Sequence, residues 1–209
     1  MKTPKITIII TAYNAEKTII ETLKSVKNQT FENWECIIVD DNSKDDTVAI
    51  VTKFIALDHR FSLILNGQNL KQPKSINKAL SKTNEDYVMI LDSDDVLSEN
   101  CFVNRIKLIK DTEDYDYYVF PNQYKFSNKL NKENKYILDT EKLDIILKRF
   151  LIHYLPTAWQ VTGILFKRET LEGIGGFNEK MVRMVDVELS TRLLLSDYRY
   201  KIFNVEPDY

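Results

Sequence analysis

The sequence predicts an α/β fold with a mostly parallel sheet, and two patterns support this prediction. Short β-branched apolar runs alternate with helical segments through the first hundred residues, as in strand–helix–strand units with right-handed crossovers. Polar clusters follow three of the strands directly, at 11–14, 40–42 and 92–95. Because ligands bind beyond the carboxyl ends of parallel strands, we expect the three clusters to lie along one edge and form one site.

The composition fits one compact domain and disfavours several classes of protein. The chain has 209 residues, of which 44% are hydrophobic, enough for a single core. A formal net charge of −2 disfavours a general nucleic-acid binder. Cys36 and Cys101 lack metal-binding spacing, so we expect ordinary thiols of a reducing compartment. No run approaches the roughly 18 apolar residues of a membrane span, which predicts a cytoplasmic protein and leaves peripheral membrane association open.

In the first half of the chain, helical patterns follow the predicted strands. The strand at 6–10 carries apolar residues on both faces, as a buried parallel strand requires. After the second strand, at 36–39, Ser43 and Asp46 predict a capping-box-like helix start. The other predicted elements are helices near 19–26 and 76–80, strands at 61–65, 87–91, 117–121 and 163–167, a polar loop at 127–135, a glycine-rich turn at 173–177, and helices at 140–150 and 186–195.

Three carboxylates, Asp92, Asp94 and Asp95, lie within four residues at the end of a buried strand. Such carboxylates repel each other unless a cation compensates. Mg²⁺ and Mn²⁺ take oxygen ligands, often one or two carboxylates together with substrate phosphates. The alternative is a solvated turn that caps a helix.

Asp40 and Asp41 end the second strand, and a carboxylate there can accept hydrogen bonds from a nucleobase or a ribose. We favour Asp41 as the base reader and expect one of the pair to cap the N-terminus of the next helix instead. Tyr13 is a candidate to stack on the base or to flank it, against the alternative of a rim or core tyrosine. Thr11 offers a hydroxyl beside it.

Taken together, these motifs resemble the family 2 glycosyltransferases of GT-A fold, with matching spacing through nearly the whole chain. The matching segments are 9–14, 25–30, 34–43, Asn77 fifteen residues before Asp92-Ser93-Asp94-Asp95, 175–179 and 186–189. The resemblance implies one GT-A domain over residues 1–209, with a Rossmann-like, mostly parallel central sheet flanked by helices. Residues 1–98 would form the nucleotide-sugar-binding half and residues 99–209 a smaller acceptor-side half.

The resemblance also implies an inverting transfer from a nucleotide-diphosphate sugar to a hydroxyl acceptor. Asp94 matches the usual direct ligand of Mn²⁺ or Mg²⁺, and Asp92 matches a position that supports the metal or the ribose. Asp186 matches the general base, with Glu188 as the runner-up. The residues expected to bind the donor are Thr11, Ala12, Tyr13, Asp41, Asp92 and Ser93.

The partners that this resemblance favours are a UDP-sugar and a glycan or lipid-linked glycan acceptor. Such a reaction belongs to bacterial cell-surface polysaccharide or lipid-linked glycan synthesis, in the cytoplasm or at the inner face of the cell membrane. His153, Tyr154 and Trp159 lie where the family builds its acceptor site, and Trp159 is a candidate to stack on a sugar. Core packing is the alternative for Trp159.

The chain departs from the family pattern at three places. Ile76 stands where the family often has an arginine that holds the donor, Lys71 stands where it often has a glycine, and Val185 stands where an acidic residue often precedes the base. Lys71 and Lys74 are candidates to supply the missing positive charge, against the alternative of solvated lysines.

Two other functions remain open from the sequence. The departures motivate a nucleotide-sugar-binding module with impaired catalysis. A sugar nucleotidyltransferase is the third candidate, although residues 11–17 lack its glycine-rich basic loop. The sequence stops soon after the helix that follows Asp186, which is compatible with C-terminal truncation.

Overall fold

The computed structural model describes residues 3–121, 125–126, 129–130, 160–206 and 208. Its strands, in chain order, are β1 (Ile6–Ala12), β2 (Trp34–Asp40), β3 (Phe61–Leu65), β4 (Tyr87–Asp92), β5 (Tyr117–Val119), β6 (Lys125–Phe126), β7 (Lys129–Leu130), β8 (Ile164–Lys167) and β9 (Tyr200–Ile202). Its helices are α1 (Ile19–Lys27), α2 (Thr47–Ile55), α3 (Gln72–Leu80), α4 (Cys101–Lys110), the 3₁₀ turn η2 (Val161–Gly163), α6 (Arg168–Gly173) and α7 (Val185–Leu194).

Seven of these strands form one mixed sheet in the order β3-β2-β1-β4-β8-β5-β9. Strands β3, β2, β1 and β4 run parallel to one another, as the alternating pattern of the first half predicts. Strand β8 is antiparallel to both β4 and β5. The predicted mostly parallel α/β architecture is therefore confirmed, and β8 joins the two halves of the chain in one hydrogen-bonded sheet.

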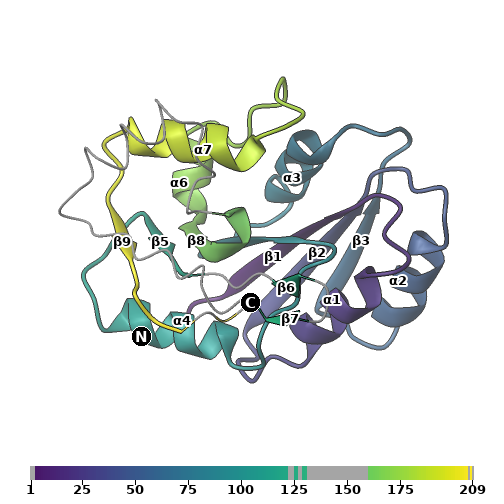
Figure 1. Cartoon of the computed structure of the whole chain (residues 1–209), viewed down its shortest axis with the longest axis horizontal. Helices are drawn as coiled ribbons and strands as arrows, with labels where there is room; N and C mark the ends of the chain where they lie inside the picture. Colours follow the sequence, from purple (N-terminus) through teal and green to yellow (C-terminus); the bar gives the residue numbers. More distant parts are fainter. Residues whose placement is uncertain (1–2, 122–124, 127–128, 131–159, 207, 209) are drawn as a thin grey trace.

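Helices cover both faces of this sheet (Figure 1). On one face α1, α2 and α4 pack through residues such as Leu23, Val51 and Ile106. On the other face α3, α6 and α7 pack through residues that include Ile76 and Leu189. Because β1, β2 and β4 carry apolar side chains on both faces, these strands are buried from both sides.

The predicted capping box at Ser43 and Asp46 is wrong. Helix α2 begins only at Thr47, and Asp46 makes no side-chain cap hydrogen bond. The Ser43 hydroxyl instead accepts a hydrogen bond from the backbone N–H of Asn14 at 2.9 Å, and Asp45 Oδ1 accepts from the backbone N–H of Thr47 at 3.1 Å. Ser43 thus ties the first polar cluster to the second.

The second half of the chain differs from its prediction in several places. Strand β5 ends at Val119, and the expected polar loop at 127–135 contains β7, which pairs with β6. The last predicted helix is confirmed as α7. Helices α4 and α6 and strand β9 have no counterpart in the prediction. The helix predicted at 140–150 lies outside the described residues.

Candidate functional site

The polar clusters at the ends of β1, β2 and β4 meet at one edge of the sheet, as the sequence predicts. In the parallel registers, Thr11 of β1 lies beside Asp92 of β4, and Ala12 lies beside Asp40 of β2. The backbone N–H of Asp41 donates to the Ala12 carbonyl at 2.8 Å and extends this pairing past the strand end. The sheet register therefore places the three clusters at one edge.

Asp41 is buried and anchors the loop between β3 and α3. Its Oδ1 accepts hydrogen bonds from the side chain of Asn66 at 2.9 Å and the backbone N–H of Leu70 at 2.7 Å. The Ser75 hydroxyl lies 3.2 Å from the same oxygen. Asp41 Oδ2 accepts only from the backbone N–H of Lys71, at 2.8 Å, among the described contacts. Because a carboxylate oxygen has two lone pairs, Oδ2 keeps room for one more donor.

Neither Asp40 nor Asp41 caps helix α2, which begins at Thr47, so the expectation that one of the pair caps the next helix is wrong, and Asp40 instead holds a turn. Its Oδ2 accepts from the backbone N–H of Ser43 at 2.9 Å, across Asn42, which has a φ of 68°. Its Oδ1 is buried and has no hydrogen-bond partner among the described residues. Asp40 therefore shapes the turn that carries Asp41 into place.

Tyr13 is half exposed at the same edge, where 50% of its surface is accessible. The turn that presents it is fixed by Asn14, whose side-chain oxygen accepts from the backbone N–H of Lys44 at 2.8 Å. Ala12 is buried, and Thr11 is partly exposed. Tyr13 therefore lies outside the core, where its side chain is accessible to a ligand.

The acidic segment after β4 combines two partly buried carboxyls with one exposed carboxyl. The side-chain amide of Gln72 donates to Asp92 Oδ1 at 2.8 Å, and the Thr162 hydroxyl donates to Asp95 Oδ2 at 2.9 Å. Asp94 is exposed, and Ser93 is partly exposed. The segment therefore presents Asp94 to solvent and ties down the carboxyls on either side of it.

The pKa of Asp92 is raised to about 6, mainly by burial and then by the nearby charges of Asp95 and Asp94. The charge of Asp186 raises it further, while the hydrogen bond from Gln72 lowers it. Burial also raises the pKa of Asp95, and the Thr162 hydroxyl opposes that shift. The edge thus concentrates negative charge that a cation would relieve.

The described residues contain no group of three His, Cys, Asp or Glu side chains arranged to hold a metal ion. A hard divalent ion commonly takes one or two carboxylates from a protein and its other oxygens from a phosphate ligand and water. Asp94, which is exposed, and Asp92, two residues before it, offer two such carboxylates at the end of β4. The donor set therefore fits Mg²⁺ or Mn²⁺ shared with a phosphate group.

Asp186 lies in the first turn of α7, and its charge acts on Asp92. Its Oδ1 accepts from the backbone N–H of Val187 at 2.9 Å. Glu188, the other acidic residue of that turn, is bound by Arg192 through two hydrogen bonds of 2.8 and 2.9 Å and also accepts from Asn178. Glu188 is therefore engaged in holding α7, whereas Asp186 keeps its second oxygen free of any described hydrogen bond.

Asn77 holds the glycine-rich turn that leads to α7. Its side chain donates to the Phe177 carbonyl and accepts from the Phe177 N–H, each at 2.8 Å. Gly176 has a φ of 67°, and a Cβ there would lie 2.6 Å from the Asn77 side-chain oxygen. Glycine is thus required both for the backbone conformation and for this close approach.

The departures at Ile76 and Val185 are accommodated by apolar packing. Ile76, on the inner face of α3, is fully buried, and Val185 packs against the same core. Lys71 and Lys74 are exposed, and neither side chain has a described partner. His153, Tyr154 and Trp159 lie outside the described residues.

Three residues of this edge were not singled out by the sequence. Gln72, Asn66 and Thr162 contact Asp92, Asp41 and Asp95 respectively. The sequence singled out their neighbours Lys71, Lys74 and Asn77 but not these three residues, because hydrogen bonds between distant segments leave no local pattern.

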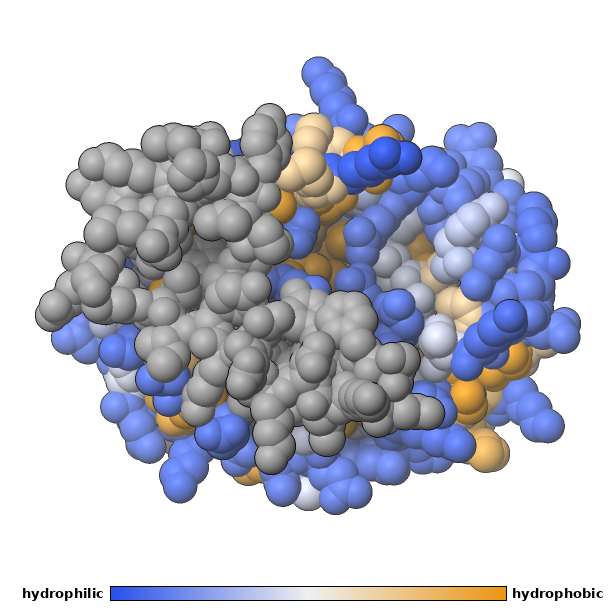
Figure 2. All heavy atoms as spheres, viewed as in Figure 1, coloured by the Kyte–Doolittle hydropathy of each residue, from blue (hydrophilic) through white to orange (hydrophobic). Residues whose placement is uncertain are grey.

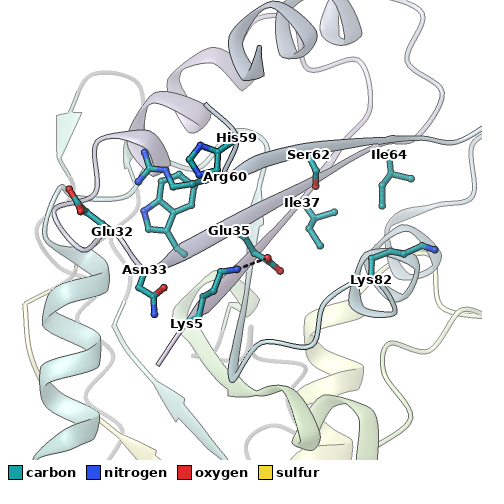
Figure 3. A pocket seen from close by; sticks show the side chains of 11 residues that line it. Lys5, Glu32, Asn33, Glu35, Ile37, His59, Arg60, Ser62, Ile64 and Lys82 are labelled. Carbon is teal, nitrogen blue, oxygen red and sulfur yellow. Dashed lines mark hydrogen bonds and ion pairs between the residues drawn. The ribbon is translucent and has the colours of Figure 1, made fainter. Parts of the chain in front are cut away.

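A separate cavity of about 580 Å³ lies at the opposite edge of the sheet, and Figure 3 shows the side chains around it. Its wall includes Trp34 at the start of β2, and the guanidinium of Arg60 lies 3.9 Å from the centre of the indole ring. Lys5 bridges Glu35 and Glu85 beside it. This cavity contains none of the residues predicted for the site. Elsewhere, hydrophilic residues cover much of the described surface in the view of Figure 2.

Solved structures share the fold of this chain. The crystal structure of S. aureus TarS 1–349 matches with a TM-score of 0.78 and 22% identity, over 98% of this chain and 59% of that chain. TarS 1–349 was also solved in complex with UDP-GlcNAc. The mannosyltransferase PcManGT from Pyrobaculum calidifontis, in complex with GDP-Man and Mn²⁺, matches with a TM-score of 0.72 and 19% identity, over 99% of this chain and 56% of that chain. These matches confirm the predicted GT-A fold.

Curated proteins match at the sequence level. Uncharacterized glycosyltransferase MJ1057 of Methanocaldococcus jannaschii is 26% identical over 97% of this chain and 69% of its own length. Putative glycosyltransferase EpsE of Bacillus subtilis is 37% identical over 44% of this chain and 34% of its own length. The GalNAc(5)-diNAcBac-PP-undecaprenol beta-1,3-glucosyltransferase of Campylobacter jejuni is 38% identical over 45% of this chain and 31% of its own length.

The aligned segments span only about a third of EpsE and of the Campylobacter jejuni protein. No helix in the described part of the chain is long and apolar enough to cross a membrane. The profile of Glycosyl transferase family 2 matches residues 7–172, most of the sequence. With the fold and this match together, the chain belongs to glycosyltransferase family 2.

Proposed function

We propose that this chain is the donor-binding and catalytic domain of a metal-dependent, inverting glycosyltransferase. The observation that carries the proposal is the meeting of Asp92, Asp94 and Asp95 with Asp186 at one sheet edge, where burial and then these neighbouring charges raise the pKa of Asp92 to about 6. The carboxyls of the segment after β4 suit a metal-bound diphosphate, and the Asp186 carboxyl on α7 suits proton transfer.

The nucleotide would bind over the ends of β1 and β2. Asp41 Oδ2, which accepts one described hydrogen bond, would take the N–H of the base. Tyr13, with its exposed ring, would flank the base, and Thr11, Ala12 and Ser93 would line the path toward the sugar. A UDP-sugar is the favoured donor because TarS was solved with UDP-GlcNAc. The GDP-Man complex of PcManGT makes a GDP-sugar the competitor.

Asp94 and Asp92 would hold Mn²⁺ or Mg²⁺ together with the donor diphosphate. When bound, the ion supplies positive charge that stabilises the leaving diphosphate. The exposed Asp94 carboxylate can reach a ligand without moving the strand, and Asp92 is held from behind by Gln72. Lys74, exposed and without a described partner, would supply the positive charge that Ile76 cannot.

Asp186 would act as the general base. It would accept the proton of an acceptor hydroxyl while that oxygen bonds to the anomeric carbon. The bond from that carbon to the diphosphate oxygen breaks, and the nucleoside diphosphate leaves with the electron pair. Because attack occurs opposite the leaving group, the configuration inverts. Glu188 is the weaker candidate for this role because both of its oxygens already bind Arg192.

The acceptor class follows from the relatives. The Campylobacter jejuni relative is named for a polyprenol-linked acceptor, and the matched Bacillus subtilis protein GgaA for minor teichoic acid biosynthesis. We therefore propose a cell-surface polysaccharide or lipid-linked glycan acceptor. A lipid-linked acceptor would bring the domain to the inner face of the membrane.

A binding panel tests the donor assignment. The melting temperature of the protein should rise with UDP, UDP-GlcNAc, GDP or GDP-mannose only when Mn²⁺ is present, and the favoured nucleotide should give the largest rise. Asp94→Asn should abolish the metal-dependent part. Asp197→Asn, which neutralises an exposed aspartate after α7, is the matched control and should behave as the wild type. The central assignment would be removed if all four ligands raised the melting temperature without Mn²⁺. It would also be removed if none of them raised it with Mn²⁺.

The impaired binding module is separated from the enzyme by turnover. The packing of Ile76 and Val185 in the core is the observation behind that alternative. Metal-dependent donor binding with neither transfer nor slow donor hydrolysis would favour it. Release of pyrophosphate from a nucleoside triphosphate would instead indicate a sugar nucleotidyltransferase.

A further inference from the structure

A buried arginine connects the C-terminal segment of the chain to the acidic edge. Arg105 lies in α4 and has no exposed surface. Its guanidinium forms a two-point contact with the carboxylate of Asp208, with Nε to Oδ2 at 2.9 Å and Nη2 to Oδ1 at 2.6 Å. Asp208 is itself buried. The pair therefore joins segments that are more than a hundred residues apart in the sequence.

The same guanidinium also reaches the turn η2. Arg105 Nη1 donates to the backbone carbonyl of Thr162 at 3.2 Å and lies 3.5 Å from the sulfur of Met89 in β4. The ring of Phe120 covers its centre at 4.6 Å. Arg105 is thus held on several sides, and its position fixes the backbone of Thr162.

Thr162 passes this order to the acidic segment. Its hydroxyl donates to Asp95 Oδ2 at 2.9 Å, and its backbone carbonyl accepts from Arg105. A second connection runs through the backbone, since the Ser98 N–H donates to the Asp208 carbonyl at 2.9 Å. Residues 92–98 are therefore tied at two points to the Arg105–Asp208 pair.

A buried ion pair such as Arg105–Asp208 adds little net stability by itself. Removing two charges from water costs much of what their attraction returns, and apolar residues of similar size often stabilise a core as well. A planar guanidinium with several fixed donors does, however, impose geometry on whatever it binds. Here the guanidinium binds the backbone of Thr162, and the Thr162 hydroxyl binds Asp95, which is next to the exposed Asp94.

We propose that Arg105, Asp208 and Thr162 are positioning residues that set the geometry of the acidic segment for the metal-bound donor. Asp208 orients Arg105, Arg105 fixes the η2 turn, and the Thr162 hydroxyl holds the Asp95 carboxylate away from Asp94. With Asp95 tied back, Asp94 stays open to the ion and its phosphate ligand. This inference rests on the proposed function, since it concerns the same acidic edge.

The first test follows the metal-free protein and needs no activity. In Thr162→Val, backbone amides of residues 95–98 should exchange hydrogen for deuterium about three- to tenfold faster, the factor for one lost hydrogen bond. Thr162→Ser keeps the hydroxyl and should restore slow exchange. Thr170→Val is the matched control, because Thr170 is an equally buried threonine whose hydroxyl binds the Asp116 carbonyl. Unchanged exchange at 95–98 in Thr162→Val would overturn the proposal.

The second test measures Mn²⁺ and donor affinity. Thr162→Val and Asp208→Asn should each weaken Mn²⁺ binding in the presence of UDP about three- to tenfold, with kcat at saturating metal nearly unchanged. Asp58→Asn is the control for Asp208→Asn, since Asp58 makes a similar two-point contact with Arg60 near the other edge. A fall in kcat without a change in affinity would contradict a positioning role.

The double variant tests whether the residues act in series. If Asp208 works through Thr162, the Thr162→Val/Asp208→Asn protein should lose no more affinity than the weaker-binding single variant. Full additivity of the two losses would show independent effects and overturn the series. Failure of the wild-type protein to bind any nucleotide with Mn²⁺ would defeat the proposed function instead, while the exchange test would still judge the positioning network.

Discussion

The side-chain amide of Gln72 donates to Asp92 Oδ1 at 2.8 Å, so the first residue of α3 contacts the last residue of β4. Burial and the neighbouring carboxylates raise the pKa of Asp92, and this hydrogen bond opposes them. A residue with no expected role from the sequence thus favours the ionised form of a candidate metal ligand.

Replacing Gln72 with leucine should weaken metal binding, and more so at low pH. Without its donor, the pKa of Asp92 rises further above 6, so protons compete better with the ion. We expect the Mn²⁺ concentration for half-maximal activity to rise about three- to tenfold at pH 6.5 and less at pH 8. Gln68→Leu, at an exposed position of the preceding loop, is the control. An equal effect at both pH values would argue against proton competition.

The metal-free protein should be destabilised by ionisation of Asp92. The folded pKa of about 6 exceeds the usual value of 3.8, so the folded state binds the proton more tightly than the unfolded state does. Ionised Asp92 therefore lowers the free energy of unfolding most above pH 6, and this penalty disappears as the pH falls below about 4.

Asp92→Asn should then stabilise the metal-free protein by about 2–3 kcal/mol at pH 7.5, with the gain vanishing near pH 4. The asparagine oxygen can still accept from Gln72, so the hydrogen bond is kept. Urea unfolding in the presence of EDTA at several pH values measures the difference. A gain that does not depend on pH would refute the assignment of the charge penalty to Asp92.

Two acids in the first turn of α7 should separate catalysis from stability. Asp186→Asn should lower transfer by about a hundredfold or more, the usual range for loss of a general base, with donor affinity unchanged. Glu188→Gln should instead lower the free energy of unfolding by about 1 kcal/mol, because it weakens the two-point contact with Arg192. Steady-state kinetics and chemical unfolding of both variants provide the comparison. The reverse pattern would make Glu188 the base.

Gly176→Ala should destabilise the turn before α7. Its φ of 67° disfavours alanine, and the added Cβ would lie 2.6 Å from the Asn77 side-chain oxygen. We expect a loss of about 1–3 kcal/mol in the free energy of unfolding. Gly175→Ala has a φ of 82° but open space, so it isolates the backbone cost. Equal losses for the two variants would show that the contact with Asn77 adds nothing.

The gathering of the polar strand ends was predictable because parallel strands impose it. Once the sequence places Thr11, Asp40 and Asp92 at strand ends, the registers leave little freedom in where those residues meet. The fold class followed from the same alternation of strands and helices.

The interactions that fix each carboxyl were not predictable in the same way. The partners of Asp41 come from a loop about thirty residues later, and Thr162 contacts Asp95 from the second half of the chain. Helix α4 escaped the prediction although Phe102, Ile106 and Ile109 share a buried face. Arg105 interrupts that apolar face, and its burial makes sense only with Asp208 beside it.

The indole of Trp34, packed under the guanidinium of Arg60, gives the protein an optical label in a useful place. It lies at the first residue of β2, about 20 Å along the strand from Asp40. In a Trp159→Phe background, Trp34 is the one remaining tryptophan of the sequence. Its fluorescence should change on denaturation and should not change when nucleotide is added. The signal therefore reports unfolding independently of whether a nucleotide occupies the acidic edge.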